Sequence, residues 1–347
     1  MSTRRWRHGL ADAAPAEGAD LPEVGGAEDD PAAAAPLALR PTHVESSRLP
    51  PGGFGGLLEE LVWTARPRQW LKNLLVFAAP AAAGVLGHVG PFLHSAGAVG
   101  VFCLAASATY FLNDALDAEA DRRHPRKRSR PVAAGRVSVR AAVTGAVVLM
   151  ALALGTGAAL AGYRLTVVVA VYLALSTAYS VRLKHEPILD LACLSSGFIL
   201  RAIAGGVATN VPLSDWFLIV ASFGSLFIAT GKRSAEYLQA GEDRGLHRPV
   251  LLKYPLEFLQ SVRLLSAAVT ITAYCLWAFE RSAAGLHGHH PIWSELSIIP
   301  VVLAVLYLEL HYERGGGAAP EDLAVRDLNL QVLAVAWVVL FALGVYG

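Results

Sequence analysis

One acidic stretch, Asn113-Asp114-Ala115-Leu116-Asp117-Ala118-Glu119-Ala120-Asp121, follows directly on the long apolar segment 99–112. These acids therefore lie at the mouth of a predicted membrane helix. At roughly 100° per residue, Asp114, Asp117 and Asp121 fall at relative angles of about 0°, −60° and −20° on a continuous helix, within one narrow arc. Three carboxylates on one face repel each other unless a cation lies between them.

Two interpretations of this acidic arc remain open. Mg²⁺ takes oxygen ligands, keeps several waters and is usually shared with substrate phosphates, so the three aspartates are typical of a magnesium site that holds a diphosphate. The alternative is a solvated acidic helix end, neutralised by the basic run from Arg122 to Arg140. The metal site is favoured because acids at membrane depth are costly and tend to be functional.

The composition is that of an integral membrane protein. Its 347 residues are 54% hydrophobic and only 16% charged, with a mean hydropathy of +0.45, which is too apolar for a soluble protein of this length. The formal net charge is +1, and nothing in the sequence suggests nucleic-acid binding. Cys103, Cys193 and Cys275 are scattered through the apolar segments, a spacing that supports neither a disulfide framework nor a zinc site.

The N-terminal segment, residues 1–60, differs from the remainder of the chain. Ala, Pro, Gly and acids dominate it, as in residues 13–20 and 31–36, so it lacks the apolar side chains needed to fold alone. No signal-peptide core follows its first arginines. We expect a disordered cytoplasmic tail at 1–60 and a transmembrane domain at 61–347.

Apolar segments that approach the roughly 20 residues needed to cross a bilayer predict an all-α, polytopic membrane fold. They lie at 71–89, 93–113, 141–161, 165–183, 188–208, 214–232, 258–280, 292–312 and 327–346. Lys and Arg concentrate in the loops after the second and sixth of these nine predicted spans. By the positive-inside rule, the N-terminus and the acidic stretch lie on the cytoplasmic side of the plasma (inner) membrane, and the C-terminus lies outside.

Further charged residues fall on the same predicted side. Lys72, near the start of the first span, is expected to contact a phosphate, whereas Arg68 is equally compatible with an anchor at the membrane surface. Glu186 and Asp190 form a thinner acidic pair that could complete the metal or diphosphate site. Pro187 lies between them and weakens the argument that both share one helical face.

Cations also occur inside the predicted fifth and sixth spans. Arg201 lies deep in the fifth, where it must face a partner or a wet cavity, and simple pairing with an acid is an equally open alternative. Lys232 and Arg233 end the sixth span and are either topological anchors or a second phosphate grip, of which the grip is favoured. A cavity with a carboxylate cluster and a surrounding set of cations suits departure of a diphosphate.

The pattern Asn113-Asp114-x-x-Asp117-x-x-x-Asp121 resembles the first signature of the UbiA superfamily of intramembrane prenyltransferases, and the resemblance extends over nearly all of residues 65–347. It implies about nine helices around a central cavity open to the cytoplasm. The usual second signature, an acidic DxxxD, is present only as Glu186-x-x-x-Asp190. This departure puts a standard site with two metals and an allylic diphosphate in doubt.

Several longer segments resemble one branch of that superfamily, the decaprenyl-phosphate phosphoribosyltransferases. They are 68–73, 121–131, 179–184, 201–209 and 231–233. The resemblance implies transfer of 5-phosphoribose from 5-phosphoribosyl 1-pyrophosphate (phosphoribosyl pyrophosphate) to decaprenyl or another polyprenyl phosphate, with release of diphosphate. The product would lead to the arabinose donor lipid of an arabinan-containing cell wall.

On this resemblance, Asp114, Asp117 and Asp121 are the catalytic acids and, with Asn113, hold Mg²⁺ on the diphosphate. The expected ligands of phosphoribosyl pyrophosphate are Lys72, Arg122, Lys127, Arg130, Tyr179 and Lys184. The expected grip on the lipid phosphate or a second phosphate is formed by Arg68, Arg201, Lys232 and Arg233, with Lys72 also a candidate. Because the acceptor is already an anion, no general base is required.

Two other functions remain open at this level. A prenyltransferase would move an allylic isoprenoid onto an aromatic acceptor. A lipid transporter or flippase would use the charged cavity as a substrate path, but the charges cluster at one predicted face and no repeat relates the two halves of the chain. Small residues in the 141–161 span permit close helix packing, which is compatible with a homo-oligomer.

Overall fold

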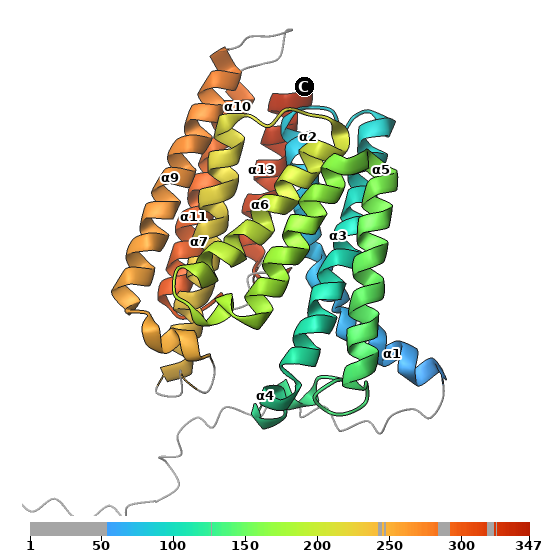
Figure 1. Cartoon of the computed structure of the whole chain (residues 1–347). Helices are drawn as coiled ribbons and strands as arrows, with labels where there is room; N and C mark the ends of the chain where they lie inside the picture. The colour runs from blue at the N-terminus through green and yellow to red at the C-terminus, as the bar shows by residue number, and fades with distance from the viewer. Residues whose placement is uncertain are drawn as a thin grey trace, which may run out of the picture. The chain divides into compact units, whose positions relative to one another are not determined.

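The computed structural model of the chain describes residues 54–125, 127–241, 245, 248–283, 292–317, 323 and 325–347. All secondary structure in these ranges is helical, so the all-α prediction is confirmed (Figure 1). Residues 1–53 of the predicted tail, 1–60, lie outside the described residues. The remaining residues, 54–60, belong to the first helix, α1 (Phe54–Ala65), and not to a disordered tail.

The described part of the chain is that of a multi-pass membrane protein. Six helices are long and apolar enough to cross a membrane, judged by length and composition. They are α3 (Val89–Leu116), α5 (Val139–Val181), α6 (Leu189–Thr209), α9 (Leu256–Ala283), α10 (Ile292–Leu296) together with α11 (Ile298–Glu313), and α13 (Leu328–Tyr346).

The predicted count of nine spans is not confirmed, for two physical reasons. The first predicted span is a 3₁₀ helix, η1 (Pro67–Phe77), followed by the short α2 (Ala78–Ala82). The third and fourth share the label α5 but remain two helical segments, because the backbone leaves helical geometry at Ala161 and at Gly162, which adopts φ +66°. The sixth is α7 (Asp215–Ala240), which is less apolar because polar and charged residues interrupt it.

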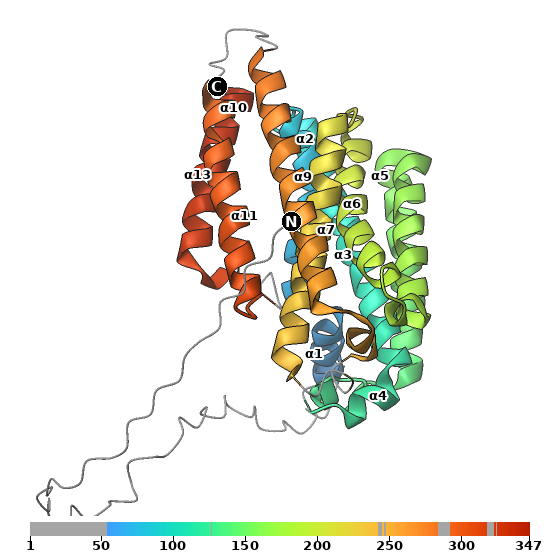
Figure 2. The ribbon, with the colours of Figure 1, turned by 90° about the vertical axis from the view of Figure 1, so that its left-hand side faces the viewer.

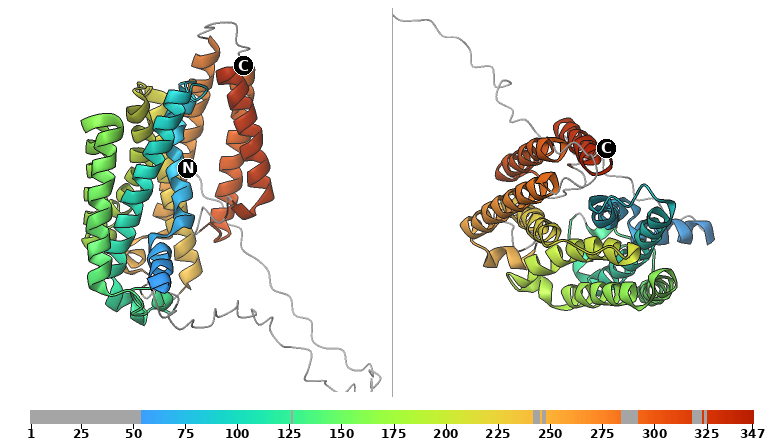
Figure 3. Two further views of the ribbon diagram at one scale, coloured as in Figure 1. Left: turned by 90° about the vertical axis from the view of Figure 1, so that its right-hand side faces the viewer. Right: turned by 90° about the horizontal axis from the view of Figure 1, so that it is seen from above.

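The helices run side by side, and their connections place several short elements at one end of the bundle. These are α4 (Ala118–Arg123), η2 (Lys127–Ser129), η3 (Leu183–His185) and η5 (Pro249–Lys253). They lie at the end near α1, below the long helices in Figure 1. Figure 2 and the end-on view of Figure 3 show α11 and α13 as a pair on the outer side of α9. The acidic stretch therefore opens at the end where the short elements gather.

Close packing of η1 on α6 depends on one glycine. A Cβ at Gly205 would lie 1.8 Å from the carbonyl oxygen of Val76. Val76 and Ala204 are both fully buried in the apolar cluster that also contains Phe102 and Leu165. A side chain at position 205 would therefore force η1 away from α6.

We expect Gly205→Ala to destabilise the protein by about 1–3 kcal/mol, the usual cost of forcing extra atoms into a packed core. Thermal unfolding of the purified protein in detergent measures this as a lower Tm. Gly155→Ala is the matched control, because its Cβ meets no atom within 4 Å and alanine favours the helix over glycine by roughly 0.5–1 kcal/mol. Equal Tm values for Gly205→Ala and the wild type would contradict the packing argument.

Candidate functional site

The acidic stretch spans a break between two helices. α3 ends at Leu116, Asp117 adopts φ −91° and ψ 3°, and α4 begins at the next residue. Asp114 and Asp121 are buried, whereas Asp117 is partly exposed. The single helical arc predicted for the three acids is therefore only partly formed, because the helix is interrupted at Asp117 while Asp114 and Asp121 still reach one shared cation.

Arg130 joins two of the acids. Its Nη1 lies 2.6 Å from Asp121 Oδ2 and 3.2 Å from Asp114 Oδ1, so both carboxylates reach one shared cation. Among the described residues, no group of three or more His, Cys, Asp and Glu side chains is arranged to hold a metal. The carboxylate oxygens suit Mg²⁺ chemically, and two of them already converge on a cation, so these residues fit the ion once substrate oxygens supply further ligands.

Arg66 adds a second guanidinium to Asp114, a contact that sequence reasoning did not identify. Its Nη2 donates to Asp114 Oδ1 at 2.5 Å, and its guanidinium carbon lies 4.9 Å from the centre of the Tyr110 ring. The Arg66 backbone is left-handed, with φ +54°, an unfavourable conformation for a residue other than glycine that precedes a proline. Nothing in the sequence around Arg66 and Pro67 indicates that the Arg66 side chain points toward Asp114.

Two lysines complete this group of charges. Lys184 Nζ lies 2.6 Å from Asp117 Oδ1. Lys127 is within electrostatic reach of Asp117, Asp121 and Arg130. Burial lowers the pKa of the Lys127 ammonium from its ordinary value, and the nearby Arg130 lowers it further. An anion bound beside Lys127 would favour its charged form.

Asp190 lies in a separate buried network with Arg233. Arg233 donates from Nε to Oδ2 at 2.5 Å and from Nη2 to Oδ1 at 2.7 Å, and both side chains are at most 1% exposed. The Tyr179 hydroxyl donates to Asp190 at 3.1 Å and accepts from Arg248 at 2.8 Å. Glu236 accepts from Arg233 at 2.6 Å. Sequence reasoning identified neither Arg248 nor Glu236, because both depend on how α7 and the following loop pack.

Three predicted site residues point elsewhere. Glu186 is 51% exposed and lies 3.6 Å from Lys253, so the expected acidic pair with Asp190 does not form. Arg122 faces Glu119, 3.4 Å away, and Arg68 is exposed on η1. In each case the side chain lies on the protein surface, where solvent or a neighbouring charge stabilises it.

Arg201 is held by neutral groups. It donates to Asn73 Oδ1 at 2.7 Å, to the Gly197 carbonyl at 2.5 Å and to the Tyr172 hydroxyl at 3.1 Å. The guanidinium also lies over the ring of Tyr172, 5.0 Å from its centre. Arg201 therefore faces partners, as expected for an arginine at this depth, but they are neutral groups, and the alternative of simple pairing with an acid is not what the structure shows.

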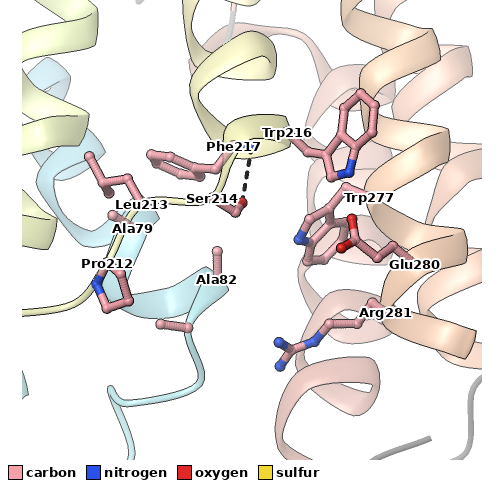
Figure 4. A pocket seen from close by; sticks show the side chains of 11 residues that line it. Ala79, Ala82, Pro212, Leu213, Ser214, Trp216, Phe217, Trp277, Glu280 and Arg281 are labelled. Carbon is pink, nitrogen blue, oxygen red and sulfur yellow. Dashed lines mark hydrogen bonds between the residues drawn. The ribbon is translucent and has the colours of Figure 1, made fainter. Parts of the chain in front are cut away.

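Two of the cavities among the described residues lie at different levels of the bundle. The larger, about 270 Å³, lies beside α2, which Figure 1 shows at the end away from α4, and its lining includes Ala82, Pro212, Trp216, Trp277, Glu280 and Arg281 (Figure 4). None of the predicted site residues lines it. The second, about 230 Å³, is formed by η1, α6 and α7 and contains two of them, Lys72 and Lys232.

Comparison with known proteins agrees with these features. The model of the UbiA prenyltransferase family matches residues 74–330. A decaprenyl-phosphate phosphoribosyltransferase from Corynebacterium glutamicum is 43% identical over 293 residues, which are 84% of this chain and 88% of that protein. A protein of the same name from Mycolicibacterium smegmatis is 42% identical over 315 residues, 88% of this chain and 98% of that one. Another, from Mycobacterium tuberculosis, is 45% identical over 286 residues, 81% and 93% of the two chains.

A solved structure shows the same fold. The structure of a UbiA homolog from Archaeoglobus fulgidus bound to GPP and Mg²⁺ superposes with a TM-score of 0.62 at 20% identity, covering 82% of this chain and 98% of that chain. The family model spans most of the chain, and the curated relatives are 42–45% identical over nearly their whole lengths. The chain therefore belongs to the UbiA prenyltransferase family.

Proposed function

We propose that this protein transfers 5-phosphoribose from phosphoribosyl pyrophosphate to decaprenyl phosphate and releases diphosphate. The observation that carries the proposal is the clustering of cations around the acidic stretch: Arg66, Arg130, Lys127 and Lys184. Phosphoribosyl pyrophosphate carries a diphosphate and a separate 5-phosphate, so it needs more cations than an allylic diphosphate. The names of the three relatives support the same substrates.

The acids of the stretch would hold Mg²⁺ together with the diphosphate. Asp114 and Asp121 already reach one shared cation, and Asp117 with Asn113 lies beside them in the chain. Bound there, Mg²⁺ would neutralise negative charge on the leaving diphosphate. The Archaeoglobus fulgidus homolog, solved with GPP and Mg²⁺, supports metal dependence in this family.

The reaction replaces one bond at C1 of the ribose. The bond from C1 to the diphosphate oxygen breaks, the diphosphate leaves with the bonding electrons, and an oxygen of the lipid phosphate forms the new bond from the opposite face. Arg130, Lys127 and Lys184 stabilise negative charge that grows on the leaving oxygens. The acceptor oxygen is already anionic, so no side chain has to remove a proton.

The acidic end of the bundle would face the cytoplasm, on the inner side of the plasma membrane, so that the water-soluble phosphoribosyl pyrophosphate reaches it from the cytoplasm. The basic residues of the 122–140 segment and the loop after α7 support this orientation. The lipid product would serve as a pentose carrier for an arabinan-containing cell wall. This pentosyl transfer differs from prenyl transfer, because here the lipid phosphate is the acceptor, whereas in prenyl transfer the isoprenoid is itself the transferred group and its diphosphate leaves.

We expect the purified protein to transfer label from phosphoribosyl pyrophosphate to decaprenyl phosphate with Mg²⁺ and not with a chelator. Asp117→Asn should lower the rate about 100-fold or more, comparable to removal of one electrostatic contact in a transition state. Asp215→Asn is the matched control, since Asp215 is exposed at the start of α7. Labelled lipid is separated by solvent extraction and chromatography.

The contrary result is folded wild-type protein that forms no labelled lipid under any of these conditions. It would overturn the phosphoribosyl proposal, and prenyl diphosphates with aromatic acceptors would be assayed next. A rate for Asp117→Asn equal to that of the wild type would remove Asp117 from the metal site.

We assign Arg233 to holding α6 against α7, because its guanidinium is fully engaged with Asp190 and Glu236. Removing one partner of a buried ion pair leaves an uncompensated charge and costs about 3–5 kcal/mol. Arg233→Met should therefore lower the Tm strongly, and Asp190→Leu combined with Arg233→Met should recover part of the loss. A loss of Tm in the double variant equal to the sum of the losses in Arg233→Met and Asp190→Leu would contradict this role.

A further inference from the structure

The cavity formed by η1, α6 and α7 combines an apolar wall with two cations. Its volume is about 230 Å³. Two ammonium-bearing side chains line it, Lys72 and Lys232, and its apolar lining includes Leu71, Leu194, Phe198 and Ile228. A ligand that matches this lining has an anionic head and a hydrocarbon chain.

Lys232 carries charge that its surroundings balance only in part. In the described part of the chain, no hydrogen bond or ion pair joins its ammonium to another residue. Lys72, Arg233, Glu236 and Arg248 lie within its electrostatic reach. Glu236 is shared with Arg233 at 2.6 Å and Arg248 at 3.6 Å. The excess positive charge beside the cavity favours a bound anion.

We propose that this cavity is the acceptor subsite, in which Lys72 and Lys232 bind the phosphate of a polyprenyl phosphate and the apolar wall holds its first isoprene units. The inference rests on the proposed function and assigns Lys72 to the acceptor instead of the donor. A phosphate of phosphoribosyl pyrophosphate offers the same chemistry to a lysine. The ribose hydroxyls, however, would lose hydrogen bonds against an apolar wall, whereas an isoprenoid gains by burial there.

The position of the cavity suits a lipid that enters from the bilayer. Leu71, which forms part of the wall, is 46% exposed at the surface of η1. Arg248 lies within electrostatic reach of both Lys232 and Lys127, so the cavity and the charges around the acidic stretch share this cation as a neighbour. The acceptor phosphate would therefore be held beside the donor, with its chain directed toward the membrane.

The test compares binding of the two substrates separately by the full-length protein in lipid nanodiscs. Dissociation constants are measured for labelled decaprenyl phosphate without phosphoribosyl pyrophosphate, and for phosphoribosyl pyrophosphate without lipid, beside the KM for each. Lys232→Met and Lys72→Met should each weaken lipid binding about tenfold or more, as expected for loss of a charge-assisted contact. The dissociation constant for phosphoribosyl pyrophosphate should stay within about twofold of the wild-type value, because the proposal gives neither lysine a contact with that substrate. This retained binding would also show that the variants are folded.

Two further variants control for charge and for the substitution itself. Lys232→Arg should keep most of the lipid affinity. Lys253→Met should leave it unchanged, because Lys253 is half exposed and contacts the His185 carbonyl at 2.8 Å outside the cavity. Unchanged lipid binding in Lys232→Met and Lys72→Met, or equal or greater weakening for phosphoribosyl pyrophosphate, would overturn the acceptor subsite.

The same measurements separate this inference from the proposed function. Wild-type protein that transfers phosphoribose, while both lysine variants bind lipid normally, refutes the subsite and leaves the function standing. Wild-type protein that binds decaprenyl phosphate through these lysines but transfers no phosphoribose refutes the function and leaves a lipid-phosphate site.

Discussion

The bidentate ion pair between Arg233 and Asp190 is the constraint on which the acidic end of the bundle depends. Both side chains are buried, and a buried charge without a partner is strongly destabilising. The pair therefore fixes α7 against α6, and the Tyr179 hydroxyl ties α5 to the same carboxylate. Arg248 reaches this hydroxyl from the loop after α7. One buried carboxylate thus fixes the relative positions of three helices and a loop.

The ion pairs around the acidic stretch differ in solvent access. Arg130, which bridges Asp114 and Asp121, is 26% exposed, so it exchanges contacts at lower cost than Arg233 does. A substrate with several phosphates can compete for such a guanidinium, and the released carboxylates are then available to a metal. The two networks therefore divide their roles: the buried pair maintains the bundle, and the partly exposed pairs are suited to ligand exchange.

Sequence reasoning predicted the helical class, the membrane environment and the end of the bundle where the charges gather, because these follow from long apolar segments and from the position of Asp114 to Asp121. It did not predict the partners of the acids. Arg66 is 48 residues from Asp114 and Lys184 is 67 residues from Asp117, so helix packing selects them. Local backbone geometry was equally hidden: no residue pattern distinguishes the 3₁₀ path of η1 from an α-helix.

Arg201 and Lys232 show why depth in a membrane helix does not by itself identify a cation that binds a ligand. Both were candidates for a phosphate grip, and both lie on helices that line the same cavity. Arg201 has its donors engaged by Asn73, Gly197 and Tyr172, so a phosphate would have to displace several hydrogen bonds to reach it. Within the described residues, Lys232 has no such hydrogen bonds and faces a largely apolar cavity that it shares with Lys72. The difference follows from donor number, because a guanidinium can be satisfied by scattered neutral acceptors, while an ammonium in an apolar cavity gains most from an anion.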